Sequence, residues 1–476
     1  MTFNSISFLV FLPLAFLAAW GRFGWPARKL ALLILSYLFY AAWNPPFVIL
    51  LWISTVIDWF AARRIDRTQS RAVKIGCLLV SLFVNLGMLV YFKYGNFFLG
   101  NFQSLGAQLG LEVPSGYSVI LPVGISFYTF QTLSYTLDIY LGRARAAKSF
   151  LDYALYVTFF PQLVAGPIVR ATDFIPQCER PPKFRWRPIG YGAFLVLWGV
   201  FQKRVMADGV FAPVVEKVYD TTGSVSFIDA WCGTIAFAGQ ILCDFSGYSI
   251  AAIGVAMMLG FALPDNFRSP YAAIGFSDFW RRWHISLSSW IRDYLYIPLG
   301  GNRNGKLRAH FNLMLTMLLA GLWHGAGWTF IVWGCLHGLL LSMERVWVKA
   351  VWSRLRHAST RRVLGALGVP VTFLLVCVTW IFFRANDMTS ALGICTSAFN
   401  PLASNRFSSL VPFGESRNAM LGMGALLSLQ QLGRKRTLED LVSSVPSILI
   451  CFIMAAMLVA TLLWASEDRA FIYFQF

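Results

Sequence analysis

Apolar runs separated by short polar segments extend along almost the whole chain. Several approach the roughly 17–25 residues with which an α-helix crosses the hydrocarbon layer of a bilayer. Others are too short to span it and are better explained as tilted or re-entrant helices. The pattern therefore predicts an all-α, polytopic integral membrane protein with about 11–14 transmembrane or re-entrant helices. The runs cover residues 5–20, 30–43, 46–62, 75–92, 118–140, 150–168, 189–201, 227–263, 311–323, 328–343, 363–383, 418–432 and 446–464.

The polar segments between these runs are all too short to form a soluble domain. We therefore expect one integral membrane domain over residues 1–476. The first basic residue, Arg22, follows the first apolar run. A cleavable signal peptide would carry its positive charge before that run, so we expect residues 5–20 to be retained.

Composition agrees with a membrane location. Only 13% of the residues are charged, about half the usual share, whereas 57% are hydrophobic and 16% are aromatic. Such a chain has too little polar surface to cover a water-soluble globule of 476 residues. The lipid bilayer is therefore its expected solvent.

Basic residues exceed acidic ones, 40 against 22, which makes the net charge +18. The basic clusters fall in every second loop between apolar runs, so we expect no nucleic-acid partner. This distribution follows the positive-inside rule and predicts that both termini lie outside the cytoplasm. The direction of the segment 189–263 stays open, because Lys203 and Arg204 fall where an outer loop is required. The clusters are Arg22/Arg28/Lys29, Arg63/Arg64/Arg67/Arg71/Lys74, Arg143/Arg145/Lys148 and Arg434/Lys435/Arg436.

The eight cysteines form no CxxC pair and show no metal-ligand spacing. Most lie inside apolar runs, where a thiol behaves as a small hydrophobic side chain. We therefore expect neither a disulfide framework nor a metal site.

The segment 321–338 reads GLWHGAGWTFIVWGCLHG and places His324 between two apolar runs. Basic loops flank both runs, so the segment is expected to enter from the cytoplasm and return. Gly325 and Gly327 allow the backbone to turn, and such backbone at membrane depth is tolerated where protein buries it or water reaches it. His324 therefore either lines a cavity or hydrogen-bonds two helices together. For His337, which has helical spacing from apolar side chains, we favour packing.

A second segment, 275–301, reads GFSDFWRRWHISLSSWIRDYLYIPLGG. Its aromatic residues recur at steps of three and four, which predicts one amphipathic helix at the membrane interface, capped by Ser277. His284 lies on the apolar side, where an imidazole needs a partner, so structural and functional roles are equally compatible with it. The polar residues of this helix are Asp278, Arg281, Arg282, Ser288, Ser289, Arg292 and Asp293.

A third segment, 236–254, reads AFAGQILCDFSGYSIAAIG. Gln240, Asp244 and Tyr248 are four residues apart and form one stripe of a helix, provided that Ser246 and Gly247 do not interrupt it. An acidic residue among apolar neighbours usually pairs with Arg or with a backbone donor. For Asp244 we therefore favour a structural polar network.

Taken in order, these segments resemble the membrane-bound O-acyltransferases, and most closely the bacterial branch that acetylates alginate and other exopolysaccharides. The resemblance covers nearly the whole chain and is strongest over LPDNFRSPYAAIGFSDFWRRWHISLSSWIRDYLYIPLGGNRNG and LTMLLAGLWHGAGWTF. In one place it fails: Ile250 follows GYS, where most members carry Asp, which weakens any role for the 240–248 stripe. The remaining matches are FNSISFLVFLPLAF, LSYLFYAAWNP, LPVGISFYTFQTLSYTLDIY, FFPQLVAGPIVRATDFIPQ, DFSGYS, WIFFRA and FIYFQF.

The resemblance implies a fold of many helices around a central tunnel, with a catalytic core at about residues 118–345 and peripheral helices at 1–117 and 363–476. His324, in LWHGA, corresponds to the active-site histidine of the family, and His284, in RWHIS, to its second active-site position. A neutral His324 would take the proton of an attacking hydroxyl. His284 or backbone N–H groups of the glycine turn would stabilise the oxyanion. Further candidates for substrate binding are Arg281, Arg282, Trp323, Asp293, Asp244 and Tyr248.

The implied reaction carries acetyl from cytoplasmic acetyl-CoA across the bacterial inner membrane, with no bound cofactor and no metal. A periplasmic or membrane-anchored acetyltransferase partner would complete transfer to a polysaccharide, with alginate the first choice and acetylated cellulose or another exopolymer the second. Peptidoglycan and teichoic acid are the acceptors of other relatives. The alternative class is a transporter or flippase without covalent chemistry, although the sequence lacks the repeat symmetry that is common in that class.

Overall fold

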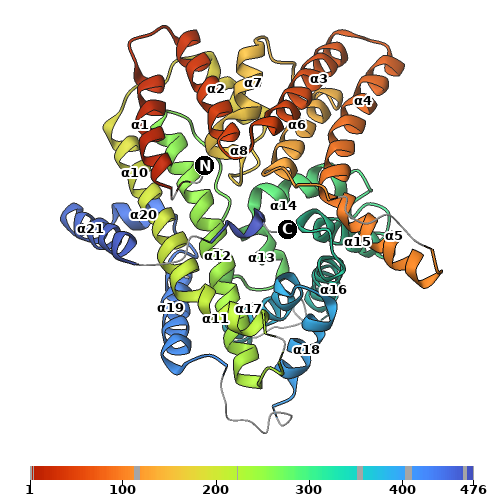
Figure 1. Ribbon diagram of the computed structural model, residues 1–476, viewed down its shortest axis with the longest axis vertical. Coiled ribbons are helices and arrows are strands. Elements are labelled where there is room, and N and C mark those ends of the chain that lie inside the picture. The colour runs from red at the N-terminus through yellow and green to blue at the C-terminus, as the bar shows by residue number, and fades with distance from the viewer. Residues whose placement is uncertain are drawn as a thin grey trace. The chain divides into compact units, whose positions relative to one another are not determined.

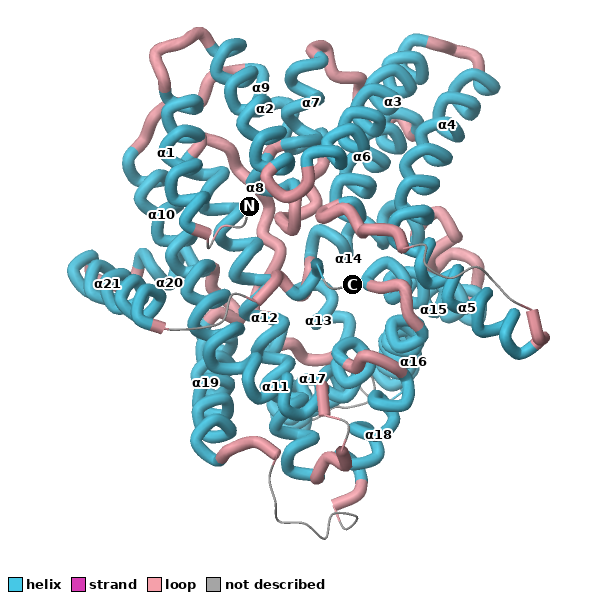
Figure 2. The backbone as a smooth tube through the Cα atoms, in the orientation of Figure 1, coloured by secondary structure: helices cyan, strands magenta, loops and turns pink. Residues whose placement is uncertain are grey.

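A computed structural model describes residues 3, 5–111, 118–221, 223–350, 358–401, 410–464 and 469–474. These residues form helices joined by loops, with no strand among them (Figures 1 and 2), so the all-α prediction is confirmed. They fall into two compact units. One consists of residues 1–196 and 249–264, and the other of residues 197–248 and 265–476.

Among the described residues, four helices are long and apolar enough to cross a membrane: Pro45–Arg67, Arg71–Gln108, Phe227–Met258 and Gly365–Arg384. Three further apolar helices are shorter, as the prediction of tilted or re-entrant segments requires. They are Ile6–Trp20, Met388–Phe399 and Ser447–Leu463. Length and composition thus support a protein with several membrane passes.

The first unit begins with helices whose starts follow local capping rules. The Ser5 side chain accepts a hydrogen bond from the Phe8 N–H at 3.3 Å, and Pro26 occupies the first turn of the second helix. The unit contains α1 (Ile6–Trp20), α2 (Trp25–Ala41), η1 (Pro45–Phe47), α3 (Val48–Arg67), α4 (Arg71–Leu89), η2 (Val90–Tyr94), α5 (Gly95–Gln108), α6 (Ile125–Tyr140), α7 (Phe150–Thr158), α8 (Phe160–Leu163), α9 (Ala171–Glu179) and most of α10 (Trp186–Phe201).

Buried polar side chains join α3, α4 and α6 inside this unit. Ser81 Oγ donates to Asp58 Oδ1 at 2.5 Å, and Asn85 Nδ2 donates to Asp58 Oδ2 at 2.9 Å. Asn85 Oδ1 in turn accepts from Ser54 Oγ at 2.6 Å and from Thr132 Oγ1 at 3.2 Å. Since few other polar partners exist in apolar surroundings, such a network fixes how the three helices pack.

The second unit carries the histidine motifs. Its helix α12 runs without interruption through Ser246 and Gly247, so the 240–248 stripe lies on one helix. The unit contains η3 (Gln202–Phe211), α11 (Ala212–Tyr219), most of α12 (Phe227–Met258), η4 (Pro270–Ala272), α13 (Phe276–Arg282), α14 (Ile285–Ile291), η5 (Arg292–Tyr296), α15 (Lys306–His324), α16 (Trp328–Ala350), α17 (Ala358–Arg384), α18 (Met388–Phe399), α19 (Phe413–Leu432), α20 (Leu438–Ser443), α21 (Ser447–Leu463) and η7 (Ile472–Phe474).

The predicted hairpin around His324 is confirmed. Helix α15 ends at His324, Gly325 is extended, and α16 begins at Trp328. The two helices approach closely at glycines: a Cβ atom on Gly321 would lie 3.1 Å from the Gly334 Cα, and one on Gly334 would lie 3.1 Å from the Leu318 Cα. Small residues at this crossing therefore let the two backbones touch.

The prediction of one amphipathic helix over 275–301 is wrong. Helices α13 and α14 are separate, and His284 between them has a φ of 44°. Trp283 and His284 are both fully buried. On a helix with one exposed face, two consecutive residues point in different directions and are rarely both buried. Ser277 is not the cap either, because its Oγ donates to Glu344 Oε2 at 3.2 Å and Gly275 precedes the helix. The burial of both rings, rather than the helical spacing of the aromatic residues, therefore decides the backbone conformation between α13 and α14.

Candidate active site

His324, the last residue of α15, lies within a shell of aromatic rings. Its side chain is buried, with 2% exposed. Its ring centroid is 5.0 Å from that of the neighbouring Trp323, 4.9 Å from that of Trp333 and 5.3 Å from that of Phe383. A ring on a remote segment, Tyr473, lies 5.7 Å away. These rings form a surrounding of low polarity that excludes bulk water from the imidazole.

His284 faces the same site. Its ring centroid is 6.4 Å from that of His324 and 5.9 Å from that of Trp323. Its left-handed backbone is unusual for a residue with a side chain and requires support from the surrounding structure. That support includes a hydrogen bond from the Ile285 N–H to the Asn266 carbonyl at 2.9 Å. The structure thus brings together both predicted catalytic histidines and Trp323.

Asn266 determines which nitrogen of His284 carries the proton. Asn266 Oδ1 accepts from the Ser286 N–H at 3.2 Å and from Ser286 Oγ at 2.9 Å, and it lies 3.1 Å from His284 Nδ1. An amide oxygen only accepts, so Nδ1 must be the donor. His284 lies outside the helices that are long enough to cross a membrane, and burial lowers the pKa of its imidazole to about 3. The neutral ring therefore presents an accepting lone pair at Nε2.

His337 has a structural surrounding, as its helical spacing predicted. Trp280 Nε1 donates to His337 Nδ1 at 3.3 Å, and Thr379 Oγ1 lies 3.0 Å from His337 Nε2. The Thr379 hydroxyl donates to the Val376 carbonyl at 2.7 Å, so Nε2 is the donor to Thr379. His337 thereby ties α13 and α17 to α16.

We expect His337→Ala to destabilise the fold without abolishing activity. Loss of two buried hydrogen bonds and of the ring should lower the free energy of unfolding by about 2–4 kcal/mol. Thermal unfolding in detergent measures this loss, with His310→Ala on the half-buried start of α15 as the control. A fall in activity of more than about tenfold in the folded variant would assign His337 to the reaction instead.

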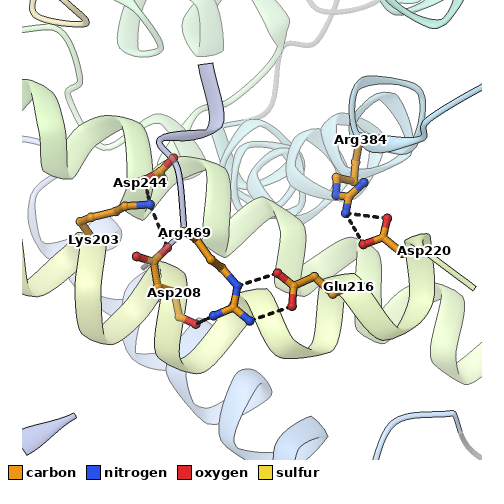
Figure 3. Close-up of polar contacts among 7 residues, drawn as sticks. All are labelled: Lys203, Asp208, Glu216, Asp220, Asp244, Arg384 and Arg469. Atoms are coloured by element: carbon orange, nitrogen blue, oxygen red, sulfur yellow. Dashed lines mark hydrogen bonds and ion pairs between the residues drawn. The ribbon is translucent and has the colours of Figure 1, made fainter. Parts of the chain in front are cut away.

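Asp244 belongs to a polar network, the role that the sequence favoured for it. Lys203 Nζ lies 2.8 Å from Asp244 Oδ1 and 2.8 Å from Asp208 Oδ1 (Figure 3). The other Asp244 oxygen accepts the Ile472 N–H at 2.7 Å. Tyr248, one turn further along α12, packs on Phe471 with ring centroids 5.0 Å apart. Both residues therefore contact the segment 469–474.

The remaining binding candidates have other surroundings. Arg282 is half-buried and engaged: its Nε donates to Asp278 Oδ1 at 2.9 Å, and its Nη1 donates to the Arg434 carbonyl at 3.3 Å. Asp293 lies 2.7 Å from Arg292 Nε. Arg281 is exposed and could meet an anion from solvent. A role of these residues in binding the donor stays a prediction.

Two residues of this site, Asn266 and Tyr473, were not predicted as site residues from the sequence. Each is remote in sequence from the histidine that it contacts, and neither belongs to a periodic pattern. The only available signal was that both lie in motifs of the family resemblance, LPDNF and FIYFQF. Their place beside the histidines is decided by tertiary packing.

The described residues thus form a helical protein with apolar spans and with two buried histidines in one aromatic shell. Residues 143–385 match the profile of the membrane-bound O-acyltransferase family. The chain is 39% identical over 425 residues to the peptidoglycan O-acetyltransferase of Helicobacter pylori, covering 83% of this chain and 79% of that protein. It therefore belongs to the membrane-bound O-acyltransferase family and is an O-acyltransferase with several membrane passes.

Other relatives differ in the acceptor that their names give. The chain is 39% identical over 411 residues to the probable alginate O-acetylase AlgI of Pseudomonas aeruginosa, covering 84% of this chain and 75% of that protein. It is 24% identical over 277 residues to the teichoic acid D-alanyltransferase of Bacillus subtilis, covering 56% of this chain and 69% of that protein. This chain is thus similar in sequence to relatives whose names give different acceptors.

Proposed function

We propose that this protein moves acetyl from cytoplasmic acetyl-CoA across the bacterial inner membrane for O-acetylation of a secreted polysaccharide, with alginate as the first acceptor to test. The observation that carries this proposal is the pair of histidine rings, 6.4 Å apart in one buried aromatic site. The names of the relatives that are 39% identical support acetyl as the group transferred. Both termini are expected on the periplasmic side.

In the proposed reaction an acceptor hydroxyl attacks the thioester carbonyl carbon while His324 takes the hydroxyl proton. The tetrahedral intermediate collapses, the C–S bond breaks, and the imidazolium returns its proton to the CoA thiolate. The products are the acetyl ester of the acceptor and free CoA thiol, and His324 is again neutral. The aromatic rings around His324 keep out water, which would otherwise compete as the nucleophile and hydrolyse the thioester.

The tautomer of His284 assigns it a different role from oxyanion stabilisation. With Nδ1 donating to Asn266, the neutral Nε2 can accept a hydrogen bond from the hydroxyl but cannot donate one to an oxyanion. The Gly325 N–H already donates to the Gly321 carbonyl at 3.3 Å. We therefore assign the oxyanion to the N–H groups of Ala326 and Gly327 in the turn.

A periplasmic or membrane-anchored acetyltransferase is the proposed partner that passes the acetyl group to the polymer. Peptidoglycan is the second candidate acceptor, because the H. pylori relative is as similar to this chain as the alginate one. Acetylated cellulose and teichoic acid are further acceptors to compare. A transporter or flippase is the competing class, and it would break no C–S bond.

Protein reconstituted in lipid vesicles should release one CoA thiol for each acetyl group transferred. The assay supplies acetyl-CoA with a labelled acetyl group, the candidate partner, and alginate, peptidoglycan or cellulose fragments in parallel. Thiol release with label on alginate supports the proposal, and label on another polymer reassigns the acceptor. Movement of intact acetyl-CoA without thiol release would support the transporter and overturn the enzymatic proposal.

A further inference from the structure

The segment 469–474, which we call the strap, is held at its first residue by charge. Arg469 donates from Nε to Glu216 Oε1 at 2.5 Å and from Nη2 to Glu216 Oε2 at 2.7 Å (Figure 3). Its Nη1 donates to the Asp208 carbonyl at 3.0 Å. A bidentate contact between Arg and a carboxylate is directional as well as strong. The strap is therefore fixed to α11 and η3 at this end.

A second attachment lies three residues further along. Asp244 accepts the Ile472 N–H through one carboxylate oxygen at 2.7 Å, and Lys203 Nζ lies 2.8 Å from the other oxygen. Asp244 and Lys203 are both buried. A buried carboxylate is costly unless its oxygens are paired or hydrogen-bonded. The Ile472 N–H of the strap therefore helps to stabilise the buried charge of Asp244. This contact sets the position of the backbone at Ile472.

The residues next to this attachment enter the histidine site. The Tyr473 ring lies 5.7 Å from His324 and 4.3 Å from Phe245, and Phe245 lies 4.7 Å from His284. The Phe471 ring packs on Tyr248. One side of the site is thus built from the strap. The hydrogen bond at Ile472 is on the residue immediately before Tyr473, whose ring lies beside His324.

The strap has little structure that would position it by itself. Its one regular element is a single 3-10 turn, Ile472–Phe474, so its location depends on contacts with the rest of the unit. Glu216 and Asp244 contact the strap, Lys203 pairs with Asp244, and the Tyr473 ring of the strap lies beside His324. Moving either attachment would therefore displace Tyr473 from the catalytic histidine.

We propose that Glu216, Asp244 and Lys203 are positioning residues for acyl transfer, which act by holding the strap against His324. This inference rests on the proposed function for its kinetic consequence, but the position of the strap can be measured separately. A displacement of about 1 Å can lower a rate by about 100-fold. The three residues should therefore affect kcat more than KM.

The kinetic test is a charge reversal across the Arg469–Glu216 pair. Glu216→Arg and Arg469→Glu should each lower kcat by about tenfold or more, with the KM for acetyl-CoA within about twofold of wild type. The double variant restores an ion pair of opposite direction and should recover to within about threefold of wild type. Glu415→Gln is the matched control. Glu415 forms an exposed ion pair with Lys217, which lies next to Glu216 on α11, and this pair does not include a residue of the strap.

The structural test places the photo-crosslinker p-benzoylphenylalanine at position 473 and identifies the captured peptide by mass spectrometry. Crosslinks to residues 306–328 should form in the otherwise wild-type chain, fall in Glu216→Arg and return in the double variant. The conservative Glu216→Gln and Asp244→Asn serve the same two measurements if the reversed variants do not fold. Unchanged crosslinking in these variants, or lost crosslinking with full kcat, would overturn the positioning role. If acetyl transfer fails in every protein while crosslinking follows this pattern, the strap is held as inferred and the proposed function is what fails.

Discussion

His324→Ala should lower the rate of acyl transfer by about 100- to 10,000-fold, the usual contribution of a positioned general base. The residue ends α15 inside the aromatic shell, with its ring centroid 4.9 Å from that of Trp333 and 5.3 Å from that of Phe383. Thiol release from acetyl-CoA in lipid vesicles measures the effect. Binding of acetyl-CoA and thermal unfolding, measured on the same samples, show whether the variant is intact.

The matched control for this variant is His310→Ala. His310 lies on the same helix, near its first turn and partly exposed, so its loss tests removal of an imidazole without disturbing the site. Undiminished thiol release from a folded His324→Ala protein would make His324 a packing residue and would remove the basis of the proposed mechanism. Loss of release together with loss of folding calls for His324→Gln, which retains polarity and most of the volume.

Gly334→Val should destabilise the α15–α16 hairpin by about 3 kcal/mol or more. A Cβ atom at this position would overlap the Met317 carbonyl oxygen and would lie 3.1 Å from the Leu318 Cα, both of which are backbone atoms that cannot rotate away. Inserting atoms into a packed interface forces such backbone shifts. Because His324 and Trp333 come from the two sides of this hairpin, activity should fall with stability.

Thermal unfolding in detergent and the yield of folded protein measure this effect. Gly327→Ala is the control, since its Cβ would meet only ordinary contacts, at 3.5 Å or more, in the same turn. A Gly334→Val protein with wild-type unfolding temperature would show that the helices can separate at this point, and the close crossing would then not be required. A strongly destabilised Gly327→Ala would attribute the effect to the turn itself.

Local sequence was sufficient for the features that depend on neighbouring residues. The apolar runs predicted a helical membrane protein, and GLWHGAGW predicted a hairpin with His324 at its turn. Helical spacing favoured packing for His337, and isolation among apolar residues favoured a polar network for Asp244. In each case the bilayer and the helix period impose a constraint that is visible within about 20 residues.

Other features depend on residues that meet only after folding. The break between α13 and α14 departs from a regular helical pattern, because Trp283 and His284 must both be buried and Asn266 must reach the imidazole. Periodicity cannot indicate a partner that lies 18 positions away. The single helix predicted over 275–301 was wrong for this reason.

His324 and the strap differ most clearly in how far the local sequence predicts them. The sequence determined that the chain is a helical membrane protein and that His324 sits at a turn, since hydrophobic length and glycine freedom act locally. Only the tertiary structure decided that Tyr473 of the strap lies beside His324, and that Arg469 and Asp244 are points of attachment. Ion pairs and main-chain hydrogen bonds across more than 200 residues leave no periodic trace, because each requires only that two distant groups be complementary once the helices have packed.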